Sequence, residues 1–322
     1  MRTFFLVRGS RGPYRARMLQ PRFRMGALAV GVTLVVSMLS ATPAHATLLP
    51  SCVDLNNNGV CDAGEPALAP LLNAGTFNTT VAVPGYTPPA GMVGIVLNDF
   101  PLTADGLNLT ATGGIVVNGK LKNPAAIDMS MQAETITLAP GAQIYYGQTH
   151  NGANGITLFA STFIMGDKSQ IKVGGDFNLW DIEAENVHIG TSAKLMTLGD
   201  DTEIDVTATN SLTFGTNAQF HTSNSGTVSI LAQVSWAATG LKVTSDTIDL
   251  EADSPDGLSF TPERTLSLTN SNINQDASDG SLTISAGTPG FHSAIDQLTF
   301  THTRIRSVAG SPDLEPTPII LL

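Results

Sequence analysis

The chain has 322 residues and a formal net charge of −11, with 16 basic and 27 acidic side chains. Nucleic-acid binding depends on neutralising phosphates with Lys and Arg, so this balance argues against nucleic acid and favours divalent cations as partners. The two cysteines are too few for a disulfide-rich scaffold.

Residues 1–46 have the pattern of an export signal. They carry seven of the 16 basic residues and none of the 27 acidic ones, and an apolar run extends from Met25 to Leu39. Ala44 and Ala46 supply small residues at the −3 and −1 positions of a cleavage site. A membrane anchor is the alternative, but the run is shorter than the ~20 residues that span a bilayer. We therefore predict a signal peptide cleaved after Ala46, and a secreted or cell-surface protein.

Residues 54–65 have the spacing of a twelve-residue calcium loop. Oxygen-bearing side chains fall at loop positions 1, 3, 5, 9 and 12, and Gly59 occupies position 6, where the backbone must turn sharply. Position 7 needs only a backbone carbonyl. The sequence therefore predicts calcium as a cofactor, with these ligands: Asp54, Asn56, Asn58, Val60, Asp62 and Glu65.

Both cysteines, Cys52 and Cys61, flank or lie in this loop. An exported protein meets an oxidising compartment, where a Cys52–Cys61 bridge would close a short loop around the metal ligands. Two free thiols, or pairing with another chain, are the alternatives. We predict the internal bridge.

Residues 66–92 are rich in proline, which interrupts helices and sheet ladders. Together with the loop they form a predicted cap and linker, residues 47–92. From there to residue 308 the chain consists of short strand-like runs separated by turn residues.

Four of these runs share one frame, with two apolar residues, usually a glycine, a polar turn and a further apolar residue. They end at Ile144, Ile171, Leu195 and Phe220, which are 27, 24 and 25 residues apart. A period near 25 residues with several short strands per unit indicates a solenoid. We predict a right-handed parallel β-helix of roughly eight coils over residues 93–308. Glycines 166, 190 and 215 are expected in turns that require a positive φ. An antiparallel sandwich or barrel is the competing fold.

Residues 95–308 resemble the right-handed β-helices of secreted bacterial adhesins of the filamentous haemagglutinin type. The runs FIMG, VHIG and LTFG, with the alanines of the turns that follow, carry this resemblance. Separately, residues 52–65 resemble the EF-hand-like and dockerin-like calcium loops of exported bacterial proteins. The resemblances imply a β-helical fold and an extracellular setting.

An enzyme on the same scaffold is the main alternative function. Asp176 and Asp200 each follow a matched apolar position by five residues, so they could stack on adjacent coils of a polysaccharide lyase or hydrolase. A solvated row of turn aspartates is the simpler interpretation. Four aromatic residues could offer a sugar-stacking surface, although so few are ordinary for a chain of this size: Trp180, Trp236, Tyr145 and Tyr146.

Residues 309–322 form a predicted tail that ends in four apolar residues. Open solenoid ends pair readily with other chains, so the ends or this tail are candidates for self-association into fibres. We predict a non-catalytic, adhesin-like component of the cell surface or extracellular matrix. Its other partners would be glycans or cell-surface ligands.

Overall fold

The structure is a computed structural model, and the residues that it describes all lie within one compact unit, Thr47–Leu322. The described ranges are 51–68, 76–78, 93–98, 100–101, 106–123, 128–146, 154–175, 178–223, 225–252, 264–278, 280–286, 296–309, 312–315 and 319–321. The predicted signal peptide lies outside them. Over these ranges the fold is all-β, so none of their segments is a helix able to cross a membrane.

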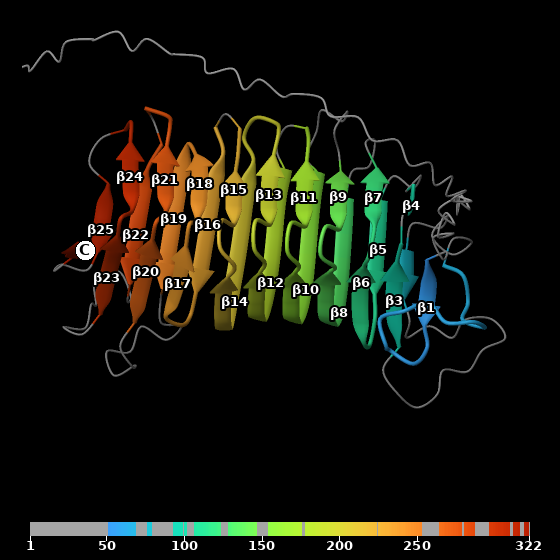
Figure 1. Ribbon diagram of the computed structural model, residues 1–322. Coiled ribbons are helices and arrows are strands. Elements are labelled where there is room, and N and C mark those ends of the chain that lie inside the picture. Colours follow the sequence, from blue (N-terminus) through green and yellow to red (C-terminus); the bar gives the residue numbers. More distant parts are fainter. Residues whose placement is uncertain are drawn as a thin grey trace, which may run out of the picture. The chain divides into compact units, whose positions relative to one another are not determined.

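Two large sheets run the length of this unit (Figure 1). Sheet A comprises 13 strands: β1 (Cys52–Asp54), β2 (Thr76–Asn78), β3 (Gly94–Leu97), β5 (Gly106–Thr110), β6 (Gly114–Val117), β8 (Asp128–Leu138), β10 (Asn154–Met165), β12 (Asn178–Ile189), β14 (Glu203–Phe214), β16 (Thr227–Ala232), β19 (Thr247–Ala252), β22 (Leu282–Ala286) and β25 (Asp313–Glu315).

Sheet B stacks nine strands: β4 (Phe100–Pro101), β7 (Lys120–Asn123), β9 (Gln143–Tyr146), β11 (Gln170–Val173), β13 (Lys194–Thr197), β15 (Gln219–His221), β18 (Lys242–Ser245), β21 (Asn272–Gln275) and β24 (Arg304–Ser307). Sheet C has four strands: β17 (Trp236–Thr239), β20 (Thr265–Thr269), β23 (Gln297–Thr301) and β26 (Ile319–Leu321).

The predicted parallel β-solenoid is confirmed. From β3 onward each strand pairs in parallel with its equivalent one coil away. Ile144, Ile171, Leu195 and Phe220 stand in one register, as their sequence spacing predicted. The coil count was wrong: sheet B stacks nine strands where roughly eight coils were expected. The sequence repeat is weak at both ends of the solenoid, so a count based on the repeat underestimates the number of coils.

Inside the solenoid, apolar side chains form rows along its length. One inward row of sheet B, from Leu121 on β7 to Ile305 on β24, is apolar, while the residues on either side of it in each strand point outward. Sheet A contributes a second device, a row of buried alanines at one register position. These alanines are Ala133, Ala160, Ala184, Ala208, Ala232, Ala252 and Ala286. Each of these buried positions holds a side chain no larger than a methyl group. They lie where the long strands β8 to β14 turn between two faces of the coil.

The glycines 166, 190 and 215 are not the positive-φ residues that we expected. They are needed because neighbouring coils approach closely: a Cβ on Gly190 would lie 2.6 Å from the carbonyl oxygen of Met165 in the preceding coil. The positive φ falls two residues later in each of these turns. Its row includes Lys168, Ser192 and Asn217, with φ of 58°, 57° and 62°. The turn thus requires a glycine at one position, because coils approach closely, and a positive φ at another. The sequence analysis assigned both requirements to the glycine.

The ends of the solenoid also differ from the prediction. At the N-terminal end, β1 pairs antiparallel with β3 and covers the edge of sheet A. Within the predicted linker, β2 pairs in parallel with β5. At the C-terminal end, β25 and β26 lie in the predicted tail yet extend sheets A and C by one strand each. The tail therefore continues the solenoid: Leu314 aligns with Ile284, and Ile319 aligns with Leu298.

Candidate functional site

The predicted disulfide is confirmed: Cys52 and Cys61 are joined, with their Cα atoms 5.7 Å apart. Cys52 lies on β1, which is paired with the edge of the solenoid, whereas Cys61 lies within the candidate calcium loop. The bridge therefore ties this loop, residues 54–65, directly to the strand that covers sheet A.

The first half of the loop is wound around its own side-chain oxygens. Both carboxylate oxygens of Asp54 accept backbone N–H groups, from Asn58 at 3.1 Å and from Gly59 at 2.6 Å. The side-chain oxygen of Asn56 accepts the N–H of Asn58, and that of Asn58 accepts the N–H of Val60. Such local bonds are what Asp and Asn supply in tight turns. The side chains at loop positions 1, 3 and 5 are thus held in place by hydrogen bonds from the backbone of the loop.

The second half is held by Asp62 and Glu65. One oxygen of Asp62 accepts the side-chain amides of Asn56 and Asn58, each at 2.8 Å. These hydrogen bonds, that from Asn56 foremost, lower the pKa of Asp62. The two oxygens of Glu65 accept the backbone N–H groups of Leu55 and Asp62, both at 2.8 Å.

The chemistry of this donor set suits calcium, since all the predicted ligand atoms are oxygens. Each side-chain oxygen keeps a free lone pair, except the Asp62 oxygen that accepts both amides. The convergence of the charged groups is incomplete. Across the part of the chain that the structure describes, no three His, Cys, Asp or Glu side chains gather as a metal centre requires. Asp62 is bonded to two amides, while Asp54 and Glu65 are bonded to backbone.

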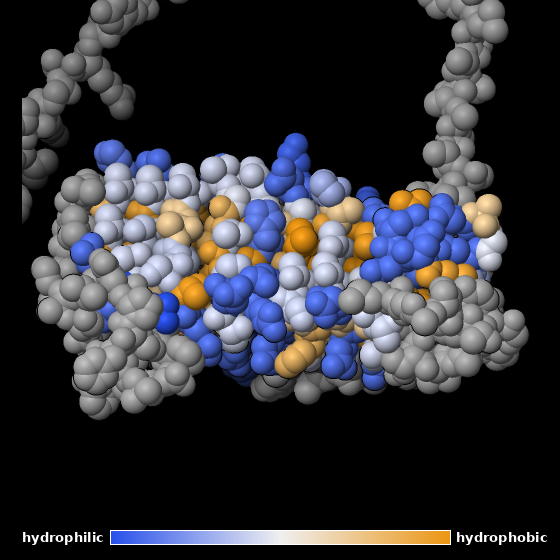
Figure 2. Space-filling view, turned by 90° about the horizontal axis from the view of Figure 1, so that it is seen from below, coloured by the Kyte–Doolittle hydropathy of each residue, from blue (hydrophilic) through white to orange (hydrophobic). Residues whose placement is uncertain are grey.

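Asn57, a residue that sequence reasoning missed, anchors the loop to the solenoid. It has a φ of 53°, and its side-chain oxygen accepts the N–H of Gly114 at 2.7 Å. Gly94 and Gly113 leave the space that this side chain fills, because a Cβ on either would collide with it. Figure 2 shows the resulting hydrophilic surface at the end where β1 lies. The two glycines that make room for Asn57 were the available sequence signal.

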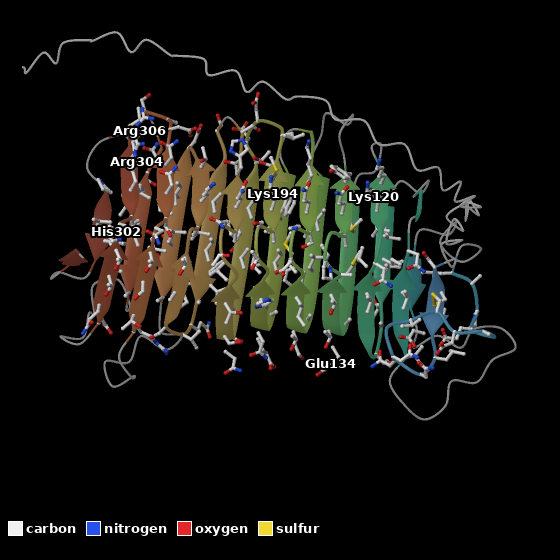
Figure 3. The ribbon with its side chains drawn as sticks, viewed as in Figure 1. Lys120, Glu134, Lys194, His302, Arg304 and Arg306 are labelled. Carbon is white, nitrogen blue, oxygen red and sulfur yellow. A yellow bond between two sulfur atoms is a disulfide. The ribbon has the colours of Figure 1, made fainter. Side chains whose placement is uncertain are left out.

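A second feature is the outward side of sheet B, which we call the basic face. Its two rows of side chains follow the register of the strands. One row is Lys120, Gln143, Gln170, Lys194, Gln219, Lys242, Asn272 and Arg304; the other is Lys122, Tyr145, Lys172, Met196, His221, Thr244, Asn274 and Arg306. No strand of sheet B carries Asp or Glu. Figure 3 places Lys120, Lys194, Arg304 and Arg306 along these strands.

Sheet A has the opposite charge. One outward row of it, the acidic row, consists of Asp181, Asp205, Ser229, Asp249, Thr283 and Asp313. Burial raises the pKa of Asp205 to about 6, and the carboxylates of Asp181 and Glu203 add to the rise. Burial also raises the pKa of Asp249, one of whose oxygens is buried without a hydrogen-bond partner.

Asp205 should make folding stability depend on pH. Its pKa is higher in the folded than in the unfolded chain, so the folded state binds more protons and is favoured at low pH. This stabilisation should be lost as pH rises from about 4 to about 6. We expect Asp205→Asn to raise the melting temperature at pH 7.5 and to change it little at pH 4. Thermal unfolding at a series of pH values measures this, with Glu185→Gln, an exposed change on the same sheet, as control.

A shallow groove crosses the alanine row on sheet A. Its polar and aromatic lining includes Phe159, which is 44% exposed, together with Ser161, Glu183 and Glu185. No Lys or Arg is among the described residues that line it. The groove thus offers carboxylates and an aromatic ring, without the facing cation that we take as the mark of a lyase site.

The other sequence candidates have mixed outcomes. Asp176 lies outside the described residues, so the stacked Asp176 and Asp200 pair stays a prediction; Asp200 itself is exposed. Trp180, Trp236 and Tyr146 are buried in the core and cannot offer a sugar-stacking surface. Tyr145 does face outward, on the basic face.

A comparison with known proteins finds a relative at low similarity. Over 170 residues, 52% of this chain, it is 31% identical to serine protease EspC of Escherichia coli O127:H6 (strain E2348/69 / EPEC). The chain spans 12% of the length of that protein. No protein-family model matches the chain, and no solved structure matches it.

Proposed function

We propose that the protein is an exported, non-catalytic β-solenoid of the cell surface or extracellular matrix, with an adhesin-like role. The observation that carries this proposal is the disulfide-tied cap on the edge of a long, regular solenoid. Disulfides form and persist in oxidising compartments, which supports export. A stack of equivalent coils offers extended flat faces to ligands, and this architecture suits binding.

Calcium is the cofactor that we propose for residues 54–65. Asp54, Asn56 and Asn58 already occupy loop positions 1, 3 and 5 with the backbone wound around them. A bound ion would draw the oxygens of Asp62 and Glu65 toward the same point, at the expense of the amide contacts to Asp62. It would also offset part of the negative charge that the loop concentrates at this end.

The calcium proposal predicts a stability effect. Extracellular calcium modules bind at roughly 10⁻⁴–10⁻³ M, so ~10 mM calcium should stabilise the protein by roughly 1–3 kcal/mol. Calorimetry in calcium and then in chelator should show a higher melting temperature with calcium. The response should vanish in Asp62→Asn and should not be reproduced by magnesium. An equal melting temperature in both solutions would remove calcium from the proposed function.

The alternative function is a polysaccharide lyase or hydrolase. One observation favours it: Asp181 and Asp205 are neighbours on adjacent coils, and the pKa of Asp205 is raised to about 6, as for a general acid. An assay of polysaccharide depolymerisation, with Asp205→Asn as the comparison, separates the two functions. Activity that is lost in this variant would replace the binding role with catalysis.

Self-association is tested by measuring the size of the particles that the protein forms. Light scattering and negative-stain microscopy of the protein without residues 1–46 should show rods or fibres if solenoid ends join. Strands β24 and β25 form the last described edges of sheets B and A, so they are the expected contact points. A monomer at all concentrations would contradict the fibre proposal and leave ligand binding as the remaining role.

A further inference from the structure

We propose that the basic face binds a linear anionic polysaccharide, a sugar chain with repeated carboxylate or sulfate groups, lying along the solenoid. This inference rests on the proposed binding function and adds to it the ligand class and the surface. Sheet A, with the acidic row, is not part of the site.

The charges of the solenoid are segregated to a degree that overall composition hides. Only nine of the 16 basic residues lie after residue 46, and seven of those nine are on the basic face. The acidic residues that the structure describes lie instead on sheet A and between strands. Exposed charges act over about one Debye length, ~8 Å at physiological salt. A ligand on the basic face therefore meets mostly the cations of sheet B, despite the net negative charge of the chain.

The spacing of the cations fits a polyanion of low charge density. Neighbouring coils are ~4.8 Å apart, so Lys120 and Lys194, three coils apart, are separated by ~14 Å along the solenoid. Lys242 and Arg304 then follow at intervals of two coils, or ~10 Å. Duplex DNA carries one charge every ~1.7 Å, far denser than this face can neutralise.

The residues between the cations suit sugar hydroxyls. Gln143, Gln170 and Gln219 place side-chain amides in the row that contains Lys120, and each amide can both donate and accept hydrogen bonds. In the second row the Tyr145 ring lies between two ammonium groups, those of Lys122 and Lys172, each 5.9 Å from its centroid. This centre, unlike the buried tryptophans, presents two ammonium groups and a phenol hydroxyl at the surface, which suits the anionic and hydroxyl groups of a sugar chain.

The acidic row of a second copy is the competing occupant of the basic face. Its carboxylates are interrupted by Ser229 and Thr283, and Asp205 and Asp249 are only half exposed. A flexible sugar chain can reach the exposed Lys and Arg termini, whereas a second rigid solenoid would have to match them with partly buried groups.

The test is a binding titration with fluorescent polygalacturonate at low salt, with dextran sulfate as the sulfated source and neutral dextran as the blank. The face variant is Lys194→Gln/Arg304→Gln, and the off-face control is Arg264→Gln, at the start of β20. Each cation is expected to contribute about five-fold in affinity, so the face variant should bind about 25-fold more weakly. The control should bind within two-fold of the unchanged protein, and Lys194→Arg/Arg304→Lys should retain binding.

The two charged polymers identify the anionic group, because tighter binding of one assigns carboxylate or sulfate. The proposal is overturned if neither polymer binds, if Arg264→Gln weakens binding as much as the face variant, or if duplex DNA binds as tightly as either polymer. Self-association that is lost in the face variant would assign the face to a second copy instead. Loss of polysaccharide binding by a protein that is still exported and stabilised by calcium refutes this inference alone.

Discussion

Gly190→Ala is expected to destabilise the solenoid by about 3 kcal/mol or more. The new methyl group would lie 2.6 Å from backbone atoms of Met165 and Gly166 in the preceding coil, closer than Cβ atoms approach other heavy atoms. Because the clash is with backbone atoms, no change of side-chain rotamer can relieve it. The two coils must therefore separate, and the hydrogen bonds between them must stretch. Urea unfolding followed by circular dichroism measures the loss.

Gly141→Ala is the matched control, because it adds the same methyl group in an equivalent turn. Gly141 has a φ of 76° and open space where its Cβ would be, so the change should cost only the left-handed conformation, about 1–2 kcal/mol. Similar losses in both variants would show that backbone conformation, rather than close approach of coils, sets the glycine requirement.

Cys52→Ser/Cys61→Ser is expected to release the N-terminal cap and to cause the protein to associate. In the chain-entropy account, a bridge across nine residues contributes about 2–3 kcal/mol. Strand β1 contacts β3 through only three residue pairs, which contribute a free energy of similar size. Without the bridge, β1 should therefore detach much of the time. Strand β3, all four residues of which are buried, would then present an open edge.

Light scattering as a function of protein concentration measures this association. Val60→Ser, which changes an exposed side chain of the same loop, serves as the control and should leave the protein unassociated. A double variant that stays as dispersed as this control would show that the hydrogen bonds of Asn57 and β1 hold the cap without the bridge.

The sequence predicted the solenoid and the disulfide because both leave regular signals. Apolar residues at Ile144, Ile171 and Leu195 recur at the coil period, and the structure aligns them. The calcium loop stays a prediction, since its carboxylates are bonded to amides and backbone N–H groups and do not converge on one point. The sequence interpretation failed in the turns, where two different residues meet two different requirements. Gly190 is needed because the neighbouring coil lies too close for a Cβ, whereas Ser192 adopts the positive φ.

The basic face was missed for a different reason. The sequence frame was built on the apolar residues, and the polar residues beside them were treated as interchangeable. Lys194 and Lys242 flank aligned apolar positions, as do the two arginines of the run RIRS. Only the register of neighbouring coils turns these scattered cations into rows. Once a solenoid is predicted, aligning the flanking residues of each coil would reveal such faces from sequence.

The alanine row also indicates where the chain accepts new sequence. Between Ala184 and Asn186 there is one residue, while the paired segment from Ala208 to Ser211 has two, and the strands stay paired on both sides. One coil has therefore lengthened at this corner without displacing its neighbours. Peptides grafted between Ala208 and Ser211 should be displayed at a defined height on the rod, which makes the corner a natural site for epitope display.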